Sequence, residues 1–397
     1  MQFVFGDYAL DVSRRELRHG SGLIAVEPQV FDLLVYLLQN RDRVVSKDDL
    51  LEVVWGGRIV SESTLTSRIN AARRAVGDSG EQQALIRTIA RKGIRFVGAV
   101  HETGAAAANA DDMGPAAGGL RQDIHFCTAP DGVRIAYAEV GHGPPLVKTA
   151  NWLSHLEYDW QSPVWRHLLH ALASDRRLIR YDARGNGLSD REVDDISFEA
   201  FVRDLESVVE ATGLQRFPLM GMSQGCAVSV AYAVRHPERV SHLVLCGGFV
   251  RGRRKRGSVT DTEQSEAVVT LMRHGWGQEN PAFRQIFTSL FIPGGSAEQV
   301  QWFNDLQRIT TSAENAVRIR QAVDEIDVSN LLPQLKVPTL VLNCLNDAVH
   351  PFDEGRRLAA GIPGARFVAL EGSNHIILDG DPAWPRFIEE IGNFLRS

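Results

Sequence analysis

A stretch of small residues divides this chain into two regions with different patterns. Residues 101–120 read HETGAAAANADDMGPAAGGL, in which Ala and Gly dominate and apolar residues show no period. Such a composition is typical of a flexible connection. With 397 residues, the chain is also too long for one ordinary core. We therefore expect a first domain over residues 1–100, a linker over 101–120 and a second domain over 121–397.

Charge is distributed unevenly between these regions. The chain has a net charge of −6, with 14 Lys and Arg against 12 Asp and Glu in residues 1–100, and 29 against 37 in the rest. Within the first domain, residues 61–95 hold seven basic side chains and three acidic ones. Phosphate contacts act over short distances, so a local basic patch is enough for a nucleic-acid contact. The acidic total therefore does not exclude DNA as a partner.

The composition also predicts the cellular compartment in which the protein resides. The sequence has no run of about 18 apolar residues, as a membrane span requires. Its start lacks the basic and apolar regions of a secretory signal. The four cysteines lie far apart without metal-ligand spacing. We expect a cytoplasmic protein without membrane contact, with reduced thiols and with neither a metal nor a cofactor. The cysteines are Cys127, Cys226, Cys246 and Cys344.

The first domain is predicted to consist of short strands around helices. Residues 3–26 alternate and turn as small antiparallel strands do, and Pro28 opens an amphipathic helix. Ser46, with Asp49 three residues later, is typical of an N-cap and begins a second helix, KDDLLEVVWGG. A third helix, STLTSRINAARRAVG, is capped by a serine at its start. The run LIRTIARKGIRFVGAV then predicts a β-hairpin with a basic turn.

Three helices followed by a basic hairpin form a winged helix-turn-helix. The stretches LLVYLLQNRDRVVSKDDLLEVVW, VSESTLTSRINAARRAVGD and IRTIARKGIRF resemble the C-terminal effector domain of OmpR/PhoB-type response regulators and of CadC-like regulators. Ile94 stands where that family usually has Tyr. The resemblance implies that the domain binds DNA.

The third helix would then lie in the major groove, with the wing in or beside an adjacent minor groove. For any single arginine, the alternative is a solvated helix face. The residues expected at the DNA are Thr64, Thr66, Ser67, Arg68, Asn70, Arg73, Arg74, Arg91 and Lys92.

In the second domain, strands alternate with helical stretches. After a hairpin turn at Asp131-Gly132 come the apolar runs PPLVKTA, RRLIRYD, FPLMGMS, HLVLCGG, PTLVLNC and ARFVALEG. This alternation predicts an α/β fold, with a mostly parallel sheet and helices on both faces. In such a sheet the ligand site lies beyond the carboxyl ends of the strands.

Three of these strand ends carry residues suited to nucleophilic catalysis. Residues 221–225 read GMSQG between a strand and a helix, and Gly-x-Ser-x-Gly at such a turn is typical of a nucleophile elbow. Asp347 follows PTLVLNCLN and His375 follows FVALEGSN. A serine is activated by a histidine that a carboxylate orients. Ser223, Asp347 and His375 are therefore the candidate catalytic residues.

The order Ser, Asp, His and the spacing resemble the α/β-hydrolase family over about residues 121–397. The similarity is closest to hydrolase domains fused to regulatory or cyclase modules. YDARGNGLS is similar to the family's D-x-R-G-x-G-x-S stretch, and we interpret its Asp182 and Arg184 as structural. The resemblance implies an oxyanion hole made by the backbone N–H groups of Gln224 and Trp152. Ala150-Asn151 stands where the family usually has His-Gly.

Residues of about 250–330 lie between two strands and are predicted to form a helical cap over the site. Some of the cap's aromatic side chains are expected to line an apolar pocket, while others pack the cap on the core. The basic run RGRRKR at residues 251–256 is interpreted as a solvated loop, with a second DNA contact or attraction of an acidic ligand as alternatives. The aromatic residues are Trp276, Phe283, Phe287, Phe291, Trp302 and Phe303.

These observations predict a multidomain chain with an α+β winged helix-turn-helix and an α/β-hydrolase fold. The favoured hypothesis is a one-component transcription regulator whose second domain binds a small carbonyl ligand, ester-like or lactone-like, either as a pure receptor or as a hydrolase of that ligand. A serine esterase or lactonase with an accessory DNA-binding domain is the alternative. A protein-interaction module with an inactive hydrolase fold is disfavoured by the complete set of catalytic residues. Tandem half-sites are typical of the resembled regulators, so a homodimer is expected.

Overall fold

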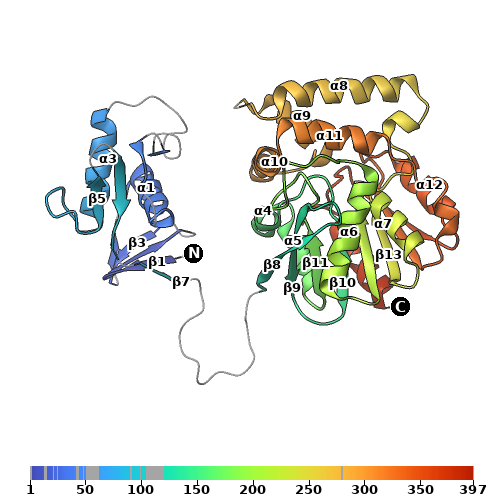
Figure 1. Cartoon of the computed structure of the whole chain (residues 1–397), viewed down its shortest axis with the longest axis horizontal. Helices are drawn as coiled ribbons and strands as arrows, with labels where there is room; N and C mark the ends of the chain where they lie inside the picture. The colour runs from blue at the N-terminus through green and yellow to red at the C-terminus, as the bar shows by residue number, and fades with distance from the viewer. Residues whose placement is uncertain are drawn as a thin grey trace. The chain divides into compact units, whose positions relative to one another are not determined.

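The chain divides into two compact units, Met1–Ala117 and Gly118–Ser397, in a computed structural model (Figure 1). Each unit has its own hydrophobic core. The structure describes residues 2–12, 16–20, 22–24, 26–41, 44–47, 49–50, 62–89, 92–98, 100–103, 120–278 and 280–396.

The N-terminal unit contains a five-stranded antiparallel sheet in the order β4-β3-β2-β1-β7. Alternating apolar residues of its strands, such as Phe3 and Leu10, are fully buried in the core. The last strand pairs with residues 2–4, so the linker begins after residue 103 rather than at residue 101. That pairing covers an edge that would otherwise stay open. The strands are β1 (Gln2–Phe5), β2 (Tyr8–Asp11), β3 (Glu16–His19), β4 (Gly22–Ile24) and β7 (His101–Thr103).

Among its described residues, the N-terminal unit also contains two helices and a hairpin. Pro28 occupies the first turn of its helix, as predicted. Ser46 and Asp49 form reciprocal capping bonds, in which each backbone N–H donates to the other side chain at 3.0–3.1 Å. Residues 51–61, which hold most of the predicted second helix, lie outside the described residues. The elements are α1 (Pro28–Gln39), α3 (Glu62–Ala75), β5 (Ile86–Ile89) and β6 (Gly93–Phe96).

The base of the hairpin explains the glycine and the isoleucine there. Gly93 has a φ of +138°, and a Cβ at this position would lie 1.9 Å from the Val45 carbonyl oxygen. The next residue, Ile94, exchanges two backbone hydrogen bonds with Val45 and is buried in the core. Isoleucine therefore supplies apolar burial where the resembled family usually has tyrosine.

The C-terminal unit is built on an eight-stranded sheet in the order β15-β14-β13-β12-β10-β11-β9-β8. β8 and β9 run antiparallel, and the other strands pair in parallel. β12 and β14 are buried along their whole length, as expected for central strands with both faces covered. The strands are β8 (Gln122–Thr128), β9 (Arg134–Val140), β10 (Pro145–Lys148), β11 (Arg177–Tyr181), β12 (Phe217–Met222), β13 (Val240–Cys246), β14 (Thr339–Cys344) and β15 (Arg366–Leu370).

Helices cover the sheet, and a helical cap lies at one end of it, as predicted (Figure 1). None of the helices in the described ranges has the length and apolarity needed to cross a bilayer. The helices against the sheet are α4 (Leu156–Gln161), α5 (Arg166–Ala173), α6 (Phe198–Thr212), α7 (Gln224–Arg235), α12 (Phe352–Gly361) and α13 (Trp384–Arg396). The cap consists of α8 (Val259–Gly275), α9 (Ala282–Phe291), α10 (Ala297–Thr310) and α11 (Ala313–Asp324).

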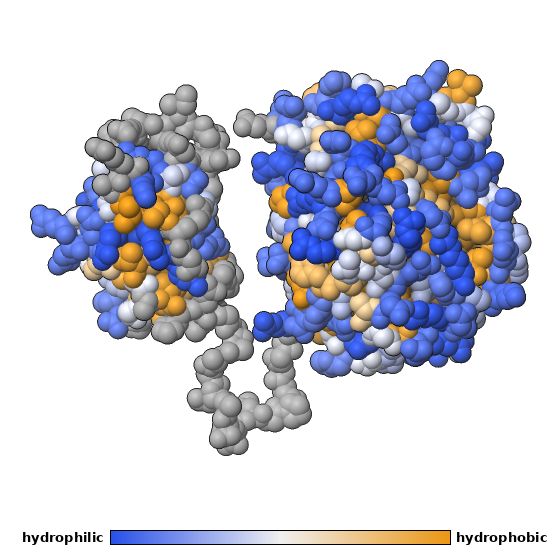
Figure 2. Space-filling view, viewed as in Figure 1, coloured by the Kyte–Doolittle hydropathy of each residue, from blue (hydrophilic) through white to orange (hydrophobic). Residues whose placement is uncertain are grey.

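The surface of the C-terminal unit is mainly polar on the face that Figure 2 shows. Hydrophilic side chains predominate there and apolar ones are scattered between them. Scattered apolar residues are ordinary on a protein surface and do not mark a binding site. This face therefore does not indicate a binding site, and the candidate catalytic residues lie instead at the ends of the strands.

Candidate active site and nucleic-acid interface

The predicted nucleophile elbow is formed between β12 and α7. Ser223 has φ and ψ of 52° and −126°, a conformation that a non-glycine residue rarely adopts. A Cβ on Gly221 would lie 2.7 Å from the Gly225 carbonyl oxygen, and one on Gly225 would lie 2.8 Å from the Ala150 carbonyl oxygen. Both glycines are therefore required by close backbone approach, and the tight turn leaves Ser223 partly exposed at the strand end.

Asp347 and His375 meet at the ends of β14 and β15. His375 Nδ1 lies 2.7 Å from Asp347 Oδ2, and both side chains are buried. Asp347 Oδ1 accepts the backbone N–H groups of Val349 at 2.8 Å and of His350 at 3.1 Å. The carboxylate is thus fixed, and it holds the histidine with Nε2 free for another partner.

Ser223 bonds to a histidine that the sequence analysis did not single out. Its Oγ lies 3.3 Å from His350 Nε2. No hydrogen bond joins Ser223 to His375 within the part of the chain that the structure describes. The structure therefore brings Asp347 and His375 together, whereas Ser223 is hydrogen-bonded to the imidazole of His350. The signal in the sequence that could have indicated His350 is its position in DAVHP, three residues after the candidate catalytic residue Asp347.

The two expected oxyanion donors lie on opposite sides of the elbow. Gln224 is the first residue of α7, so its N–H has no acceptor within the helix and lies at the positive end of the helix dipole. Trp152 lies in the loop after β10. That loop is held to the elbow because Thr149 donates its N–H to the Met220 carbonyl at 2.9 Å, while its Oγ1 lies 2.7 Å from Ser229 Oγ.

The stretch Asp182–Ser189 supports this loop, as predicted from its pattern. Asp182 accepts hydrogen bonds from Ser154 Oγ at 2.8 Å and from the N–H groups of Leu156 and Leu188 at 3.0 and 2.9 Å. Asp182 therefore connects the segment after Trp152 to the turn that contains Leu188. Neither this carboxylate nor Arg184 bonds to Ser223 or His375, so the contacts agree with a structural role.

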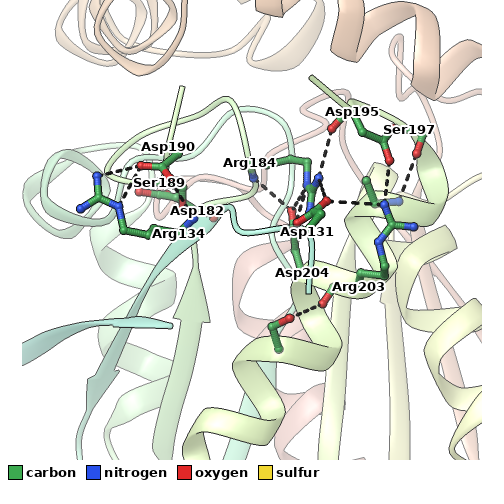
Figure 3. A network of polar contacts seen from close by, with 12 residues as sticks. Asp131, Arg134, Asp182, Arg184, Ser189, Asp190, Asp195, Ser197, Arg203 and Asp204 are labelled. Atoms are coloured by element: carbon green, nitrogen blue, oxygen red, sulfur yellow. Dashed lines mark hydrogen bonds and ion pairs between the residues drawn. The ribbon is translucent and has the colours of Figure 1, made fainter. Parts of the chain in front are cut away.

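Arg184 is the centre of a buried ion cluster (Figure 3). Its guanidinium is fully buried and bonds to Asp204 at 2.7 Å and to Asp131 at 2.6 Å. The hydrogen bond from Arg184 lowers the pKa of the Asp131 carboxyl. A guanidinium that pairs with two carboxylates has few unmet donors, as a buried cation requires. The cluster fixes the start of α6 and the Asp131 turn beneath the loop.

Aromatic side chains of the cap surround the catalytic residues. The rings of Trp152 and Trp276 are stacked with centroids 5.7 Å apart, and Phe291 lies 6.5 Å from Trp152 and 5.4 Å from His375. Other cap aromatics face elsewhere, since Trp302 packs on Tyr158 at 3.7 Å. Phe291 therefore gives His375 an apolar, aromatic neighbour, whereas Trp302 packs elsewhere.

A buried charge cluster lies behind the loop that carries Trp152. Lys148 Nζ donates to Asn151 Oδ1 at 2.5 Å, and Arg180 lies 3.9 Å from Asp159. Burial lowers the pKa of Lys148 to about 8 and raises the pKa of Asp159 to about 7. Because Asn151 directly precedes Trp152, the bond from Lys148 helps to hold the loop that carries the second expected oxyanion donor.

The cysteines of this region do not compete with Ser223. Cys226 lies one helical turn from the serine, and burial raises the pKa of its thiol to about 12. Burial also raises the pKa of Cys344, near Asp347, to about 12. Because the thiolate is the reactive form, these residues behave as packed apolar groups.

On the N-terminal unit, α3 exposes several of the residues predicted to contact DNA. Thr66, Ser67, Asn70 and Arg74 are exposed. A helix face that combines short polar side chains with an arginine suits both base edges and phosphates. The side chain of Thr64 lies outside the described residues.

Two arginines of α3 are engaged inside the domain, contrary to expectation. Arg73 is 6% exposed, and it donates to the Ile86 carbonyl at 3.1 Å and to Thr88 Oγ1 at 2.8 Å. Its guanidinium ties α3 to the hairpin and is not free for a phosphate, so its assignment to the DNA surface is wrong. Arg68 is half-buried and paired with Glu27.

The hairpin supplies further exposed basic residues. Lys92 is exposed at the turn, as predicted, and Arg91 lies outside the described residues. Arg87 and Arg95 are also exposed, on the two paired strands of the wing, directly opposite each other. Their opposite register was readable from the hairpin pattern, and Arg95 Nε also donates to the Arg41 carbonyl at 2.9 Å.

The basic run at residues 251–256 is not a free loop. Lys255 Nζ lies 3.0 Å from Glu325, Arg254 lies 3.6 Å from the same carboxylate, and Arg256 lies 3.8 Å from Asp261. Burial lowers the pKa of Arg253 to about 10. These pairs join the run to the cap, so it does not present a free basic patch.

Comparison with known proteins agrees with both halves. Residues 156–382 match the family model of the alpha/beta hydrolase fold, which covers more than half of the chain. Residues 21–96 match the model "Transcriptional regulatory protein, C terminal". The chain belongs to the α/β-hydrolase-fold family, and it carries an OmpR/PhoB-type winged-helix DNA-binding domain ahead of the hydrolase fold.

The relatives of the hydrolase unit are enzymes by name. The chain is 26% identical to a pyrrolizixenacetamide deacetylase of Xenorhabdus hominickii, over 66% of this chain and 95% of that protein. It is 28% identical to the non-heme chloroperoxidase CPO-A1 of Kitasatospora aureofaciens, over 68% and 99%. An esterase from Exiguobacterium antarcticum has the same fold, with a TM-score of 0.58, 24% identity, and coverage of 68% of this chain and 99% of that one.

Proposed function

We propose that this chain is a one-component transcription regulator whose hydrolase unit binds and cleaves a small ester or lactone at Ser223. The observation that carries the proposal is the buried Asp347–His375 pair together with the Ser223 elbow, whose hydroxyl bonds to His350 in the loop of Asp347, in a chain that also holds a DNA-binding domain. A DNA-binding domain alone would not need a nucleophile elbow. An esterase alone would not need a winged helix.

In the proposed reaction, Ser223 Oγ attacks the carbonyl carbon of the ligand. His375 Nε2 takes the hydroxyl proton and returns it to the leaving group, while Asp347 stabilises the imidazolium. The N–H groups of Gln224 and Trp152 hold the oxyanion. For the transfer, Ser223 turns from His350 to His375 by a change of its χ1 rotamer. Water then cleaves the acyl-enzyme with His375 as the base.

The aromatic residues beside the site favour a compact ligand of low polarity. Phe291 packs on His375 and on Trp152, Trp152 stacks on Trp276, and all three aromatic residues are buried. Aromatic walls bind apolar acyl groups and exclude charged ones. A small ester or lactone satisfies both the wall and the nucleophile. The deacetylase named among the relatives also acts, by its name, on an acyl group.

The DNA contact is proposed for the exposed residues of α3 and the wing. Thr66, Ser67, Asn70 and Arg74 would face the major groove, and Lys92 would flank a minor groove. Control by the ligand requires that it favour one arrangement of the two units or of a homodimer.

The test compares the wild type with Ser223→Ala. Hydrolysis of a p-nitrophenyl ester and binding to the DNA upstream of the protein's own coding sequence are measured over a salt series. The proposal expects turnover by the wild type only, and steeply salt-dependent DNA binding by both proteins. Turnover that survives in Ser223→Ala would contradict the site. Absence of DNA binding at low salt on every sequence would contradict the regulator and favour an esterase with an accessory domain.

A further inference from the structure

Ser223 faces two imidazoles, and the proposed reaction uses only one of them. His375 is bonded to Asp347 and has Nε2 free for the serine. His350 Nε2 is the atom that lies 3.3 Å from Ser223 Oγ. The two rings lie 5.3 Å apart at an angle of 73°. His350 therefore approaches the nucleophile from a different direction.

The ring of His350 is fixed in an apolar setting. The side chain is buried, and its ring packs on Phe249 with centroids 4.5 Å apart. The backbone N–H of His350 donates to Asp347, so the loop cannot shift freely. Its Nδ1 is buried without a hydrogen-bond partner among the described residues. Among the described residues, the Ser223 hydroxyl is thus the side chain to which this ring is hydrogen-bonded.

The imidazole of His350 is neutral in this setting. Burial, followed by the charges of His375, Arg256, Arg320 and Arg253, lowers its pKa well below the usual value. A neutral imidazole has one N–H donor and one acceptor nitrogen. Its Nε2 can therefore bond to a hydroxyl or, in the tautomer protonated at Nε2, to a carbonyl oxygen.

Catalysis removes the partner of His350. The serine has one hydroxyl proton, which must be directed to His375 Nε2 before the attack. When Ser223 turns, both ring nitrogens of His350 are left buried and unpaired. An unpaired buried polar group is costly, so a bound substrate that offers a hydrogen-bonding oxygen at this place is favoured over one that does not.

The substituents of the attacked carbon show which part of the substrate reaches His350. The carbonyl oxygen lies toward the N–H groups of Gln224 and Trp152, and the leaving group must reach His375 Nε2. The acyl carbon is the remaining substituent, and the proposal assigns it to the side of His350, whose Nε2 is the group that now bonds to Ser223 Oγ. An oxygen on this acyl carbon is separated from Ser223 Oγ by two carbons, the acyl carbon itself and the attacked carbonyl carbon. It therefore lies near the position that the Ser223 hydroxyl occupies before it turns.

We propose that His350 is a specificity-determining residue that selects acyl groups bearing an oxygen next to the scissile carbonyl, as in 2-hydroxy and 2-oxo esters or lactones. The proposal rests on the proposed role of Ser223 as the nucleophile. A plain alkanoyl group places a methylene or methyl group against Nε2 and leaves the imidazole without a partner. A 2-hydroxy group restores the bond that Ser223 gave up.

The test uses two esters of nearly equal shape, methyl lactate and methyl isobutyrate, which differ by a hydroxyl in place of a methyl group. We expect the ratio of their kcat/KM values to be about tenfold or more higher for the wild type than for His350→Val. Comparing the ratio between proteins cancels the intrinsic reactivity of the esters. His350→Gln, which keeps a hydrogen-bonding group, should retain part of the preference. Thermal unfolding of each variant checks that the fold is preserved.

Equal ratios in the wild type and His350→Val would overturn the proposal. So would a preference that follows a hydroxyl on the alcohol part of the ester, as in 2-hydroxyethyl esters, because the acyl side would then be misassigned. If no ester is cleaved at all, the proposed hydrolysis fails separately. Calorimetric binding of the two esters to Ser223→Ala and to Ser223→Ala/His350→Val then decides. If Ser223→Ala binds methyl lactate more tightly than methyl isobutyrate and the double variant does not, the proposed role of His350 is supported. If Ser223→Ala binds both esters equally, that role is contradicted.

Discussion

Burial has opposite meanings at the two candidate sites of this molecule. In the hydrolase unit, Asp347 and His375 are buried and bonded to each other, and this arrangement is what nucleophilic catalysis requires. On α3, the buried and bonded Arg73 is thereby removed from the DNA surface, while the exposed Arg74 stays available. A catalytic group acts through fixed neighbours, whereas a groove-binding group has to keep its hydrogen bonds for DNA.

Ser223→Ala is the change with the largest expected effect. We expect ester hydrolysis to fall by about 10⁴-fold or more, because the nucleophile is removed while the rest of the site remains. DNA affinity without ligand should be unchanged, since α3 belongs to the other unit. Ester kinetics and DNA binding measured on the same preparation check both halves. A variant that loses DNA binding as well would show that the two sites are not independent.

Arg184→Met is expected to have the largest effect on stability. It leaves Asp204 buried without its partner, and removing one side of a buried ion pair costs about 3–5 kcal/mol. Denaturant unfolding of the C-terminal unit measures the loss. The matched control is Arg134→Met, which breaks the exposed pair with Asp190 and should leave stability nearly unchanged. Equal losses in the two variants would contradict the structural role of Arg184.

Arg73→Ala and Arg74→Ala sharpen the comparison within one helix. We expect Arg73→Ala to lower the stability of the N-terminal unit by about 1–3 kcal/mol, because the buried Ile86 carbonyl and the Thr88 hydroxyl lose their donor. Arg74→Ala should leave stability nearly unchanged. It should instead reduce the slope of DNA affinity against salt by about one unit. The reverse outcome, with Arg73 controlling the salt slope, would restore Arg73 to the DNA surface.

Asp159 is expected to impose a pH dependence on the stability of the C-terminal unit. Its pKa is about 7 in the folded chain and near 3.8 when unfolded, so the folded state binds the extra proton between those values. Stability from this group is therefore full at low pH and is lost as the pH rises toward 7. Asp159→Asn should make the free energy of unfolding less dependent on pH in this range. Thermal unfolding of the C-terminal unit between pH 4 and pH 8 measures it, and an unchanged slope would contradict the assignment.

The sequence was sufficient for the features that local patterns specify. The elbow at Ser223 and the strand ends before Asp347 and His375 follow from apolar runs, glycine spacing and the parallel sheet that they predict. The winged helix follows in the same way from helical periodicity and a basic hairpin. These elements could be found because each is defined within a few residues of the chain.

Features that depend on distant packing were not accessible in the same way. His350 reaches Ser223 only because β12 and β14 are brought to the same sheet edge, and its direction is set by the bonds to Asp347. Arg73 lies on a helix face whose exposure depends on how the hairpin packs against it. The pairing of residues 101–103 with β1 likewise joins segments about a hundred residues apart.

One measurement tests most directly whether the two units act together. The affinity of the full chain for its upstream DNA is measured before and after Ser223 is modified by a fluorophosphonate, with Ser223→Ala as the control. The account predicts that modification changes the wild-type Kd by about fivefold or more and leaves the Kd of the variant unchanged. An unchanged Kd for the fully modified wild type would contradict a regulator governed by this site.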